Sequence, residues 1–216
     1  MTPHDGHGHD HHGHHHDHAP IEEHEAPPGA FQHLERAVRE LLIEKGVLTA
    51  EQISRQIDVM ESRSPALGAR VVAKAWADPA FRDALRADAR AAVGMMGIAI
   101  PDLPRLVALE NAPGLHNLVV CTLCSCYPRM LLGIPPAWYK SAPYRSRAVR
   151  DPRGVLAEFG VTLPAGTRIR VSDSTADLRF LVVPERPAGT EGWSEDQLGA
   201  LVTRDSMIGT GLALPP

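Results

Sequence analysis

Apolar side chains between residues 30 and 97 recur at the three- and four-residue spacing that is typical of amphipathic helices. This spacing predicts four helices, over residues 30–45, 49–60, 67–76 and 78–93. The second begins with the capping pair Thr49 and Gln52, and the fourth with Asp78 followed by proline. We therefore expect residues 29–97 to form a helical arm that packs on the core or on a partner protein.

From residue 98 onward the pattern changes to short apolar runs separated by proline, glycine and asparagine, as in strands and turns. The predicted strands are 106–109, 115–120, 167–172, 178–183 and 207–211. We expect the third and fourth of these to pair with each other. The predicted helices are 151–159 and 194–202. The predicted fold class is therefore α+β and layered, with residues 98–216 as the domain that carries the chemistry and residues 29–216 as one subunit fold.

The predicted strand at 115–120 runs directly into a short segment that holds every cysteine of the chain: Cys121, Cys124 and Cys126. An odd number of cysteines in so short a segment argues against a disulfide framework. Thiolates are soft metal ligands, so the segment predicts a metal site, while the alternative is three small buried side chains. A zinc site needs four protein ligands, so another donor must complete the set. Two candidates are the His116 side chain and the peptide nitrogens of Ser125 and Cys126, which bind only strongly acidic ions.

The run from Val120 to Cys126 resembles the signature of the metal-binding subunits of nitrile hydratases and of the related thiocyanate hydrolases. The resemblance continues on both sides of the cysteines and covers residues 31–211 as one subunit. The segments that carry it are 115–119, 135–140, 144–147, 155–160 and 202–205. It implies a four-layer α/β arrangement, which agrees with the layered α+β fold predicted from the apolar pattern.

The resemblance also implies a ligand set and an activity. Members of the family hold non-corrin cobalt(III) or non-haem iron(III) through three cysteine sulfurs and two main-chain nitrogens, with one position open. Carried over, the sulfurs belong to the three cysteines and the nitrogens to Ser125 and Cys126. Cys124 would be oxidised to sulfinate and Cys126 to sulfenate, and Thr122 favours cobalt over iron. The implied reaction is hydration of a nitrile to an amide, by hydroxide or by the sulfenate oxygen of Cys126, with Ser125 as a further candidate catalytic residue.

The resemblance further implies that this chain is active only with a partner. A beta-type subunit would supply two arginines to the oxidised cysteines, in a heterodimer or heterotetramer, and an activator protein is expected to assist metal loading. Arg145 and Arg147 are candidates for ion pairs across that interface, or plain surface residues.

Two departures from the nitrile hydratase pattern bear on the substrate. Arg129 stands where nitrile hydratases commonly carry tryptophan, and Asp102-Leu103-Pro104 replaces a Gln-Gly-Glu stretch. Arginine at this place is similar to the gamma subunit of thiocyanate hydrolase, and a cation suits an anionic substrate. Tyr127 and Arg129 are therefore candidate pocket residues. We predict the alpha subunit of a cobalt nitrile hydratase, with the thiocyanate hydrolase gamma subunit, which converts thiocyanate to carbonyl sulfide and ammonia, as the alternative.

Composition bears on the possible partners and on the location of the protein. The formal charge of −4 gives no reason to expect nucleic acid or an anionic membrane as a partner, and no apolar stretch is long enough for a membrane span or signal peptide. We expect a cytoplasmic protein.

Residues 1–28 hold ten of the twelve histidines and are expected to be a disordered tail. A tail of this kind suits Co²⁺ or Ni²⁺ capture, so a metal-storage or metallochaperone protein is an alternative of another class, and a structural zinc site using His116 is a further one.

Overall fold

A computed structural model describes residues 29–100, 105–124 and 126–216, apart from the side chain of Glu61. The helices in these ranges are α1 (Ala30–Glu44), α2 (Ala50–Glu61), α3 (Pro65–Ala77), α4 (Pro79–Ala87), α5 (Ala89–Met95), α6 (Arg129–Leu132), α7 (Ala137–Lys140), α8 (Ala142–Arg150), α9 (Pro152–Glu158), α10 (Glu195–Gly199) and α11 (Arg204–Ile208). The strands are β1 (Leu106–Glu110), β2 (Leu115–Val120), β3 (Arg168–Asp173) and β4 (Arg179–Val183). The predicted tail at 1–28 and the departure at 102–104 lie outside the described residues.

The four strands form two parallel pairs, with β1 beside β4 and β2 beside β3. Leu106 is in register with Arg179, and Leu115 with Arg168. The expected pairing of 167–172 with 178–183 is therefore wrong. Parallel strands need a long crossover between them, and the helices α6 to α9 supply it between β2 and β3.

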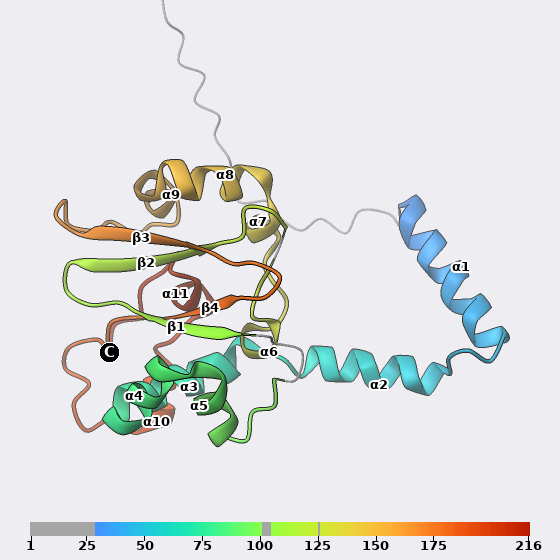
Figure 1. The fold of residues 1–216 in the computed structure, drawn as a ribbon, viewed down its shortest axis with the longest axis horizontal. Coiled ribbons are helices and arrows are strands. Elements are labelled where there is room, and N and C mark those ends of the chain that lie inside the picture. Colours follow the sequence, from blue (N-terminus) through green and yellow to red (C-terminus); the bar gives the residue numbers. More distant parts are fainter. Residues whose placement is uncertain (1–28, 101–104, 125) are drawn as a thin grey trace, which may run out of the picture.

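The two strand pairs lie between helical layers (Figure 1). Helices α8 and α9 cover the β2–β3 pair, α3, α4, α5 and α10 lie beyond the β1–β4 pair, and α11 sits between the pairs in contact with β2 and β4. The core is made of fully buried side chains from every layer, such as Val71 and Val72 of α3, Leu118 of β2 and Leu181 of β4. This arrangement confirms the layered α+β prediction.

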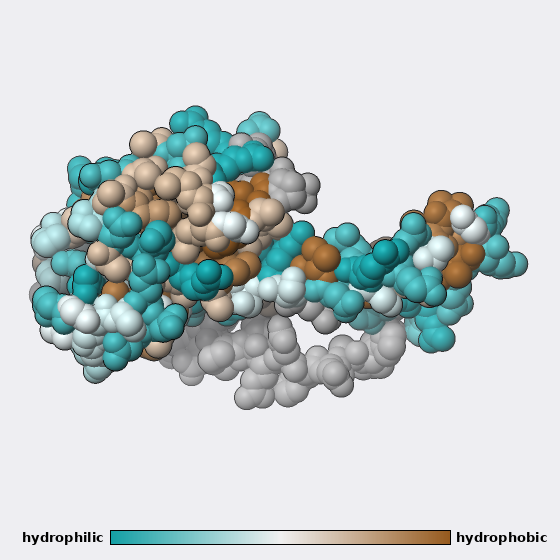
Figure 2. All heavy atoms as spheres, turned by 90° about the horizontal axis from the view of Figure 1, so that it is seen from below, coloured by the Kyte–Doolittle hydropathy of each residue, from teal (hydrophilic) through white to brown (hydrophobic). Residues whose placement is uncertain are grey.

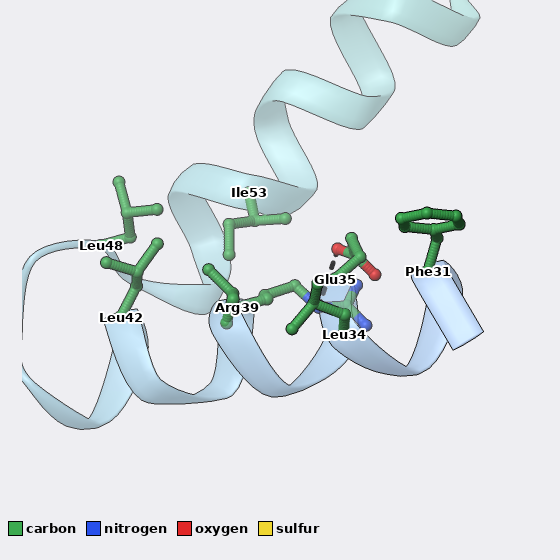
Figure 3. A pocket seen from close by; sticks show the side chains of 8 residues that line it. Phe31, Leu34, Glu35, Arg39, Leu42, Leu48 and Ile53 are labelled. Carbon is green, nitrogen blue, oxygen red and sulfur yellow. Dashed lines mark ion pairs between the residues drawn. The ribbon is translucent and has the colours of Figure 1, made fainter.

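Helices α1 and α2 project from the body as an arm (Figures 1 and 2). Both were predicted, and Thr49 and Gln52 form the expected capping box at the start of α2. No residue of α1 is buried, and Phe31 is 86% exposed. The two helices enclose an apolar hollow of about 510 Å³ that opens to solvent (Figure 3). It is lined by Phe31, Leu34, Glu35, Val38, Arg39, Leu42, Leu48 and Ile53.

Helices α3 to α5 behave differently from α1 and α2, because they contribute buried residues to the core. The division of the chain at residues 28 and 97 therefore stays a prediction. Asp88 ends α4 and caps α5, so the helix expected over 78–93 is two helices. Arg82 and Arg86 of α4 pair with Glu110 of β1.

The strand expected at 207–211 is also wrong, because Arg204–Ile208 is the helix α11, capped by Thr203. Gly209 ends this helix with φ +91°, and a Cβ placed there would lie 1.9 Å from the Asn117 carbonyl oxygen. Only glycine allows α11 to approach β2 this closely. None of the helices in the described ranges combines the length and apolar character needed to cross a bilayer.

Candidate metal centre

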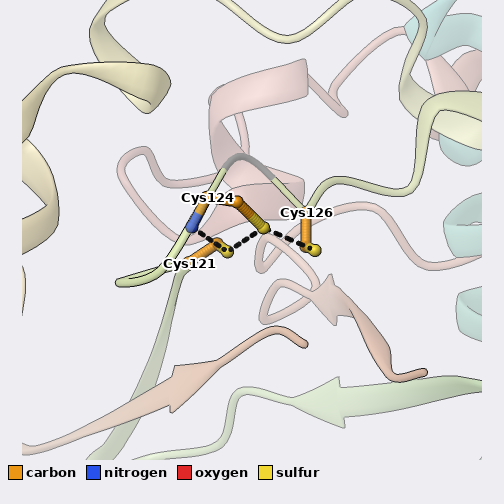
Figure 4. Close-up of side chains that lie close together, drawn as sticks. All are labelled: Cys121, Cys124 and Cys126. Carbon is orange, nitrogen blue, oxygen red and sulfur yellow. Dashed lines mark hydrogen bonds between the residues drawn. The ribbon is translucent and has the colours of Figure 1, made fainter. Parts of the chain in front are cut away.

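The cysteine segment starts where β2 ends. Strand β2 is buried from His116 to Val120, and the next residue, Cys121, is fully buried as well. The chain then turns so that Cys124 and Cys126 face Cys121 (Figure 4). The Cys124 sulfur lies 3.4 Å from that of Cys121 and 3.1 Å from that of Cys126. All three sulfurs lie within 4.8 Å of one another, too far apart for a disulfide and suitably placed for one metal ion.

Hydrogen bonds from three other elements hold the cysteine segment and the end of β2 that leads into it. The carboxylate of Asp173, the last residue of β3, accepts from the Thr122 peptide N–H at 2.9 Å and from its hydroxyl. The buried Tyr139 hydroxyl of α7 donates to the Cys126 carbonyl at 2.9 Å. The Tyr144 hydroxyl of α8 donates to the Val119 carbonyl at 2.7 Å, just before the segment. Sequence reasoning missed all three supporting residues.

Arg145 approaches the same segment from α8. Its Nη1 atom lies 3.4 Å from the Thr122 carbonyl oxygen and 3.4 Å from the Cys124 carbonyl oxygen. Its neighbour Arg147 instead pairs with Glu158 of α9, at 2.9 Å through Nη1. Arg147 therefore has a carboxylate partner within its own chain, whereas Arg145 faces the cysteine segment.

The three thiols can all ionise only beside a bound cation. Burial, together with the neighbouring Cys124 sulfur, raises the pKa of the Cys126 thiol to about 12. Three adjacent thiolates would repel one another, and a metal ion reverses this by stabilising every thiolate it binds. The donor set is soft, compact and partly shielded from water, which fits a thiolate-bound transition metal.

No other histidine, aspartate or glutamate joins the cluster in the described part of the chain. His116 lies on β2 with Nδ1 3.2 Å from the Asn111 amide nitrogen and Nε2 2.7 Å from the Gly209 carbonyl oxygen. Both ring nitrogens are thus engaged away from the sulfurs, as suits a structural strand residue.

A comparison with known proteins identifies the family. The family model described as "Nitrile hydratase, alpha chain" matches residues 30–211. The chain belongs to this family. The resemblance noted in the sequence is thereby confirmed.

Relatives in the nitrile hydratase alpha-chain family include both enzymes considered above. The low-molecular weight cobalt-containing nitrile hydratase subunit alpha of Rhodococcus rhodochrous is 50% identical over 182 residues, covering 84% of this chain and 88% of that one. Thiocyanate hydrolase subunit gamma of Thiobacillus thioparus is 47% identical over 196 residues, covering 86% and 81%. A double mutant of the Fe-type nitrile hydratase from Comamonas testosteroni Ni1 has a similar structure, with a TM-score of 0.83, 40% identity and coverage of 88% and 94%.

Two candidate pocket residues of this nitrile hydratase family member have contrasting surroundings. Tyr127 is buried, its ring packs edge-on against Tyr139 at 5.1 Å, and its hydroxyl has no hydrogen-bond partner among the described residues. Burial raises the pKa of Tyr127, so the phenol stays protonated and acts only as a neutral group. Arg129 starts α6 and is exposed. Ser125 lies outside the described residues.

Proposed function

We propose that this chain is the metal-binding alpha subunit of a cobalt nitrile hydratase, an enzyme that hydrates nitriles to amides. The observation that carries the proposal is the convergence of the three cysteine sulfurs within 4.8 Å at the end of a buried strand. Membership of the nitrile hydratase alpha-chain family and the cobalt-containing relative support the same activity.

The proposed ligands are the sulfurs of Cys121, Cys124 and Cys126 and the peptide nitrogens of Ser125 and Cys126. Cobalt is preferred over iron because of Thr122 and the cobalt-containing relative, although an Fe-type protein shares the fold. A trivalent ion held there supplies Lewis acidity to the reaction. Cys124 as sulfinate and Cys126 as sulfenate complete the proposed site.

Residues of this chain would orient the substrate and the nucleophile. Either hydroxide or the sulfenate oxygen of Cys126 serves as the nucleophile, and the Ser125 hydroxyl orients water beside it. Tyr127 directly follows Cys126 in the chain, and its hydroxyl stays protonated because burial opposes its ionisation. Such a neutral donor suits a substrate nitrogen or a water molecule.

A beta-type partner subunit is part of the proposal, in a heterodimer or heterotetramer. The arm leaves large apolar side chains exposed, including Phe31 at 86%, Leu34 at 58% and Val38 at 48%. Exposed apolar surface of this kind is typical of protein interfaces. The partner would also supply arginines to the oxidised cysteines, and an activator would help to load the metal. A cytoplasmic location agrees with three cysteines that form no disulfide.

Thiocyanate hydrolysis is the second candidate function, and Arg129 is the observation that favours it. This cation is exposed at the start of α6, three residues after Cys126, and suits an anionic substrate. The relative from Thiobacillus thioparus is a thiocyanate hydrolase gamma subunit. Activity on a neutral nitrile and on thiocyanate, measured with the same preparation, separates the two.

The test begins with the full chain co-expressed with its partner subunit in cobalt medium. We expect one tightly held cobalt and a mass increase of about three oxygen atoms, because sulfinate adds two and sulfenate adds one. Zinc, or loosely bound nickel on unmodified thiols, would support the metal-storage or structural-zinc alternatives instead. The structure gives no fourth ligand for the zinc alternative at His116, whose ring nitrogens are both engaged.

A matched pair of variants sharpens this test. Cys121→Ala removes one buried sulfur, and we expect it to abolish cobalt retention and activity. Val120→Ala removes a fully buried apolar side chain at the neighbouring position, so it should reduce stability yet retain cobalt. Full cobalt content and activity in Cys121→Ala would overturn the proposal.

A further inference from the structure

Arg145 carries a charge that no carboxylate among the described residues balances. Among the described residues, the ion pairs formed by other arginines include Arg147 with Glu158, but none includes Arg145. Its Nε atom is buried and has no hydrogen-bond partner there. Its Nη1 atom points at two carbonyl oxygens of the cysteine segment, each at 3.4 Å. A cation kept in this position suits a group that gains negative charge.

The Cys124 carbonyl is such a group. Its carbon is bonded to the Ser125 nitrogen, so the two atoms belong to one amide. If that nitrogen gives up its proton and binds a metal ion, the negative charge is shared with the Cys124 carbonyl oxygen by amide resonance. The guanidinium group of Arg145 lies 3.4 Å from this oxygen. The attraction between them grows when the charge develops, because a carbonyl dipole is replaced by an anion.

We propose that Arg145 is a positioning residue of the metal site, which stabilises the negative charge that the Cys124–Ser125 peptide gains when its nitrogen binds the metal. The inference rests on the proposed function, since it requires a main-chain ligand. The need for such a ligand follows from the cluster, which offers three sulfurs and no further side-chain donor in the described residues. The second contact, to the Thr122 carbonyl, fixes the guanidinium in place.

Three variants of the full-length chain separate the effect of the Arg145 charge from the effect of its side-chain shape. Arg145→Gln removes the charge and keeps a hydrogen-bond donor, whereas Arg145→Lys keeps the charge. Arg147→Gln is the control, because it removes a cation two residues away on α8 whose partner is Glu158. Each protein is prepared metal-free, loaded with one equivalent of Co²⁺ and then exposed to air, so that dioxygen oxidises the bound metal to the trivalent state that a peptide nitrogen requires. Sulfur-to-cobalt charge-transfer absorption then counts only the sulfur-bound metal, and a competing chelator measures its retention.

We expect Arg145→Gln to release the sulfur-bound cobalt at about tenfold less chelator, a difference of about 1.4 kcal/mol. Arg145→Lys should restore most of the retention, since a lysine ammonium supplies the charge without the planar geometry. Arg147→Gln should behave as the unaltered chain.

An isotope label provides a second measurement, the position of an infrared band, which would not change if Arg145 had only a structural role. The chain has three cysteines, so cysteine labelled with ¹³C at the carbonyl marks three peptide groups, of which only that of Cys124 includes a proposed ligand nitrogen. Infrared difference spectra between the cobalt-loaded and metal-free chain should show one labelled carbonyl band that moves strongly on loading. In Arg145→Gln the position of this band should change, and in Arg147→Gln it should not.

The outcomes distinguish this inference from the proposed function. If the unaltered chain binds cobalt through sulfur but shows no labelled band that moves, main-chain ligation fails and the inference fails with it. If the band moves, but Arg145→Gln matches Arg147→Gln in retention and band position, only the inference is overturned. Equal loss of cobalt in Arg145→Gln and Arg145→Lys with an unmoved band would show a structural role and would overturn it as well.

Discussion

We predict how much stability the protein loses when the hydrogen bond from Tyr139 to the Cys126 carbonyl is removed. Tyr139 is fully buried, and its hydroxyl donates to this carbonyl at 2.9 Å. Tyr139→Phe removes the donor but keeps the ring, which packs edge-on against Tyr127 and Trp138. The carbonyl then loses its partner in a site from which water is largely excluded. We expect the free energy of unfolding to fall by about 1–2 kcal/mol, as for other buried hydrogen bonds whose acceptor is left unsatisfied.

The assay is urea unfolding of the full chain, followed by circular dichroism, together with a thermal melt. For a chain of this size the expected loss lowers Tm by about 2–8 °C. The slope of the free energy against urea should stay the same, because the surface exposed on unfolding does not change. Cobalt retention should also fall, since the carbonyl released by the variant belongs to a proposed ligand residue.

Tyr144→Phe is the matched control. It removes an equivalent buried hydrogen bond, to the Val119 carbonyl at 2.7 Å, but acts on β2 rather than on the cysteine segment. It should cost similar stability and leave cobalt retention nearly unchanged. The reasoning is refuted if Tyr139→Phe is as stable as the unaltered chain, or if the two variants lose cobalt equally.

Two further predictions concern the contact between α11 and β2. Gly209→Ala should destabilise the protein by more than about 3 kcal/mol in urea unfolding, because the added Cβ meets the Asn117 carbonyl at a positive φ. Gly199→Ala, whose Cβ meets only Ala73 at 3.8 Å, should be neutral or slightly stabilising, and equal losses would contradict this account. Burial lowers the pKa of His116 from 6.5, so the unfolded chain takes up a proton that the native chain excludes and stability should fall as the pH drops below about 6.5. His116→Gln should flatten this slope between about pH 5 and 6.5, and an unchanged slope would exclude His116 as its source.

The sequence was most informative where one residue type carries the chemistry. The cysteines had to be close in space because they are close in the chain, and the strand before them was visible as a short run that ends in three apolar residues. Helices with a capping residue and a clear apolar face, such as α2 and α9, were also predicted.

The failures share a physical cause, since they depend on contacts between distant residues. An apolar run shows that a strand is buried but not which strand lies beside it, so the parallel pairs were missed. The short apolar run at 207–211 fits a strand or a helix equally well, and Thr203 as a cap was the overlooked signal. Helix α8 was missed among the prolines, although Ser141 before Ala142 and proline is a recognisable start. Nothing local marks Tyr139 or Asp173 as supports of the cysteine segment.

The pairing of β2 with β3 has a consequence for the order in which this protein assembles. The cysteine segment follows β2, but Asp173, which holds Thr122, comes at the end of β3 after four intervening helices. A ribosome must therefore release β3 before the segment gains its support, and β1 waits longer still for β4. Parallel contacts between such distant segments give a high contact order and slow folding. The cysteine segment therefore stays without its Asp173 support until β3 has been synthesised, so we expect the site to reach its final geometry only late in folding.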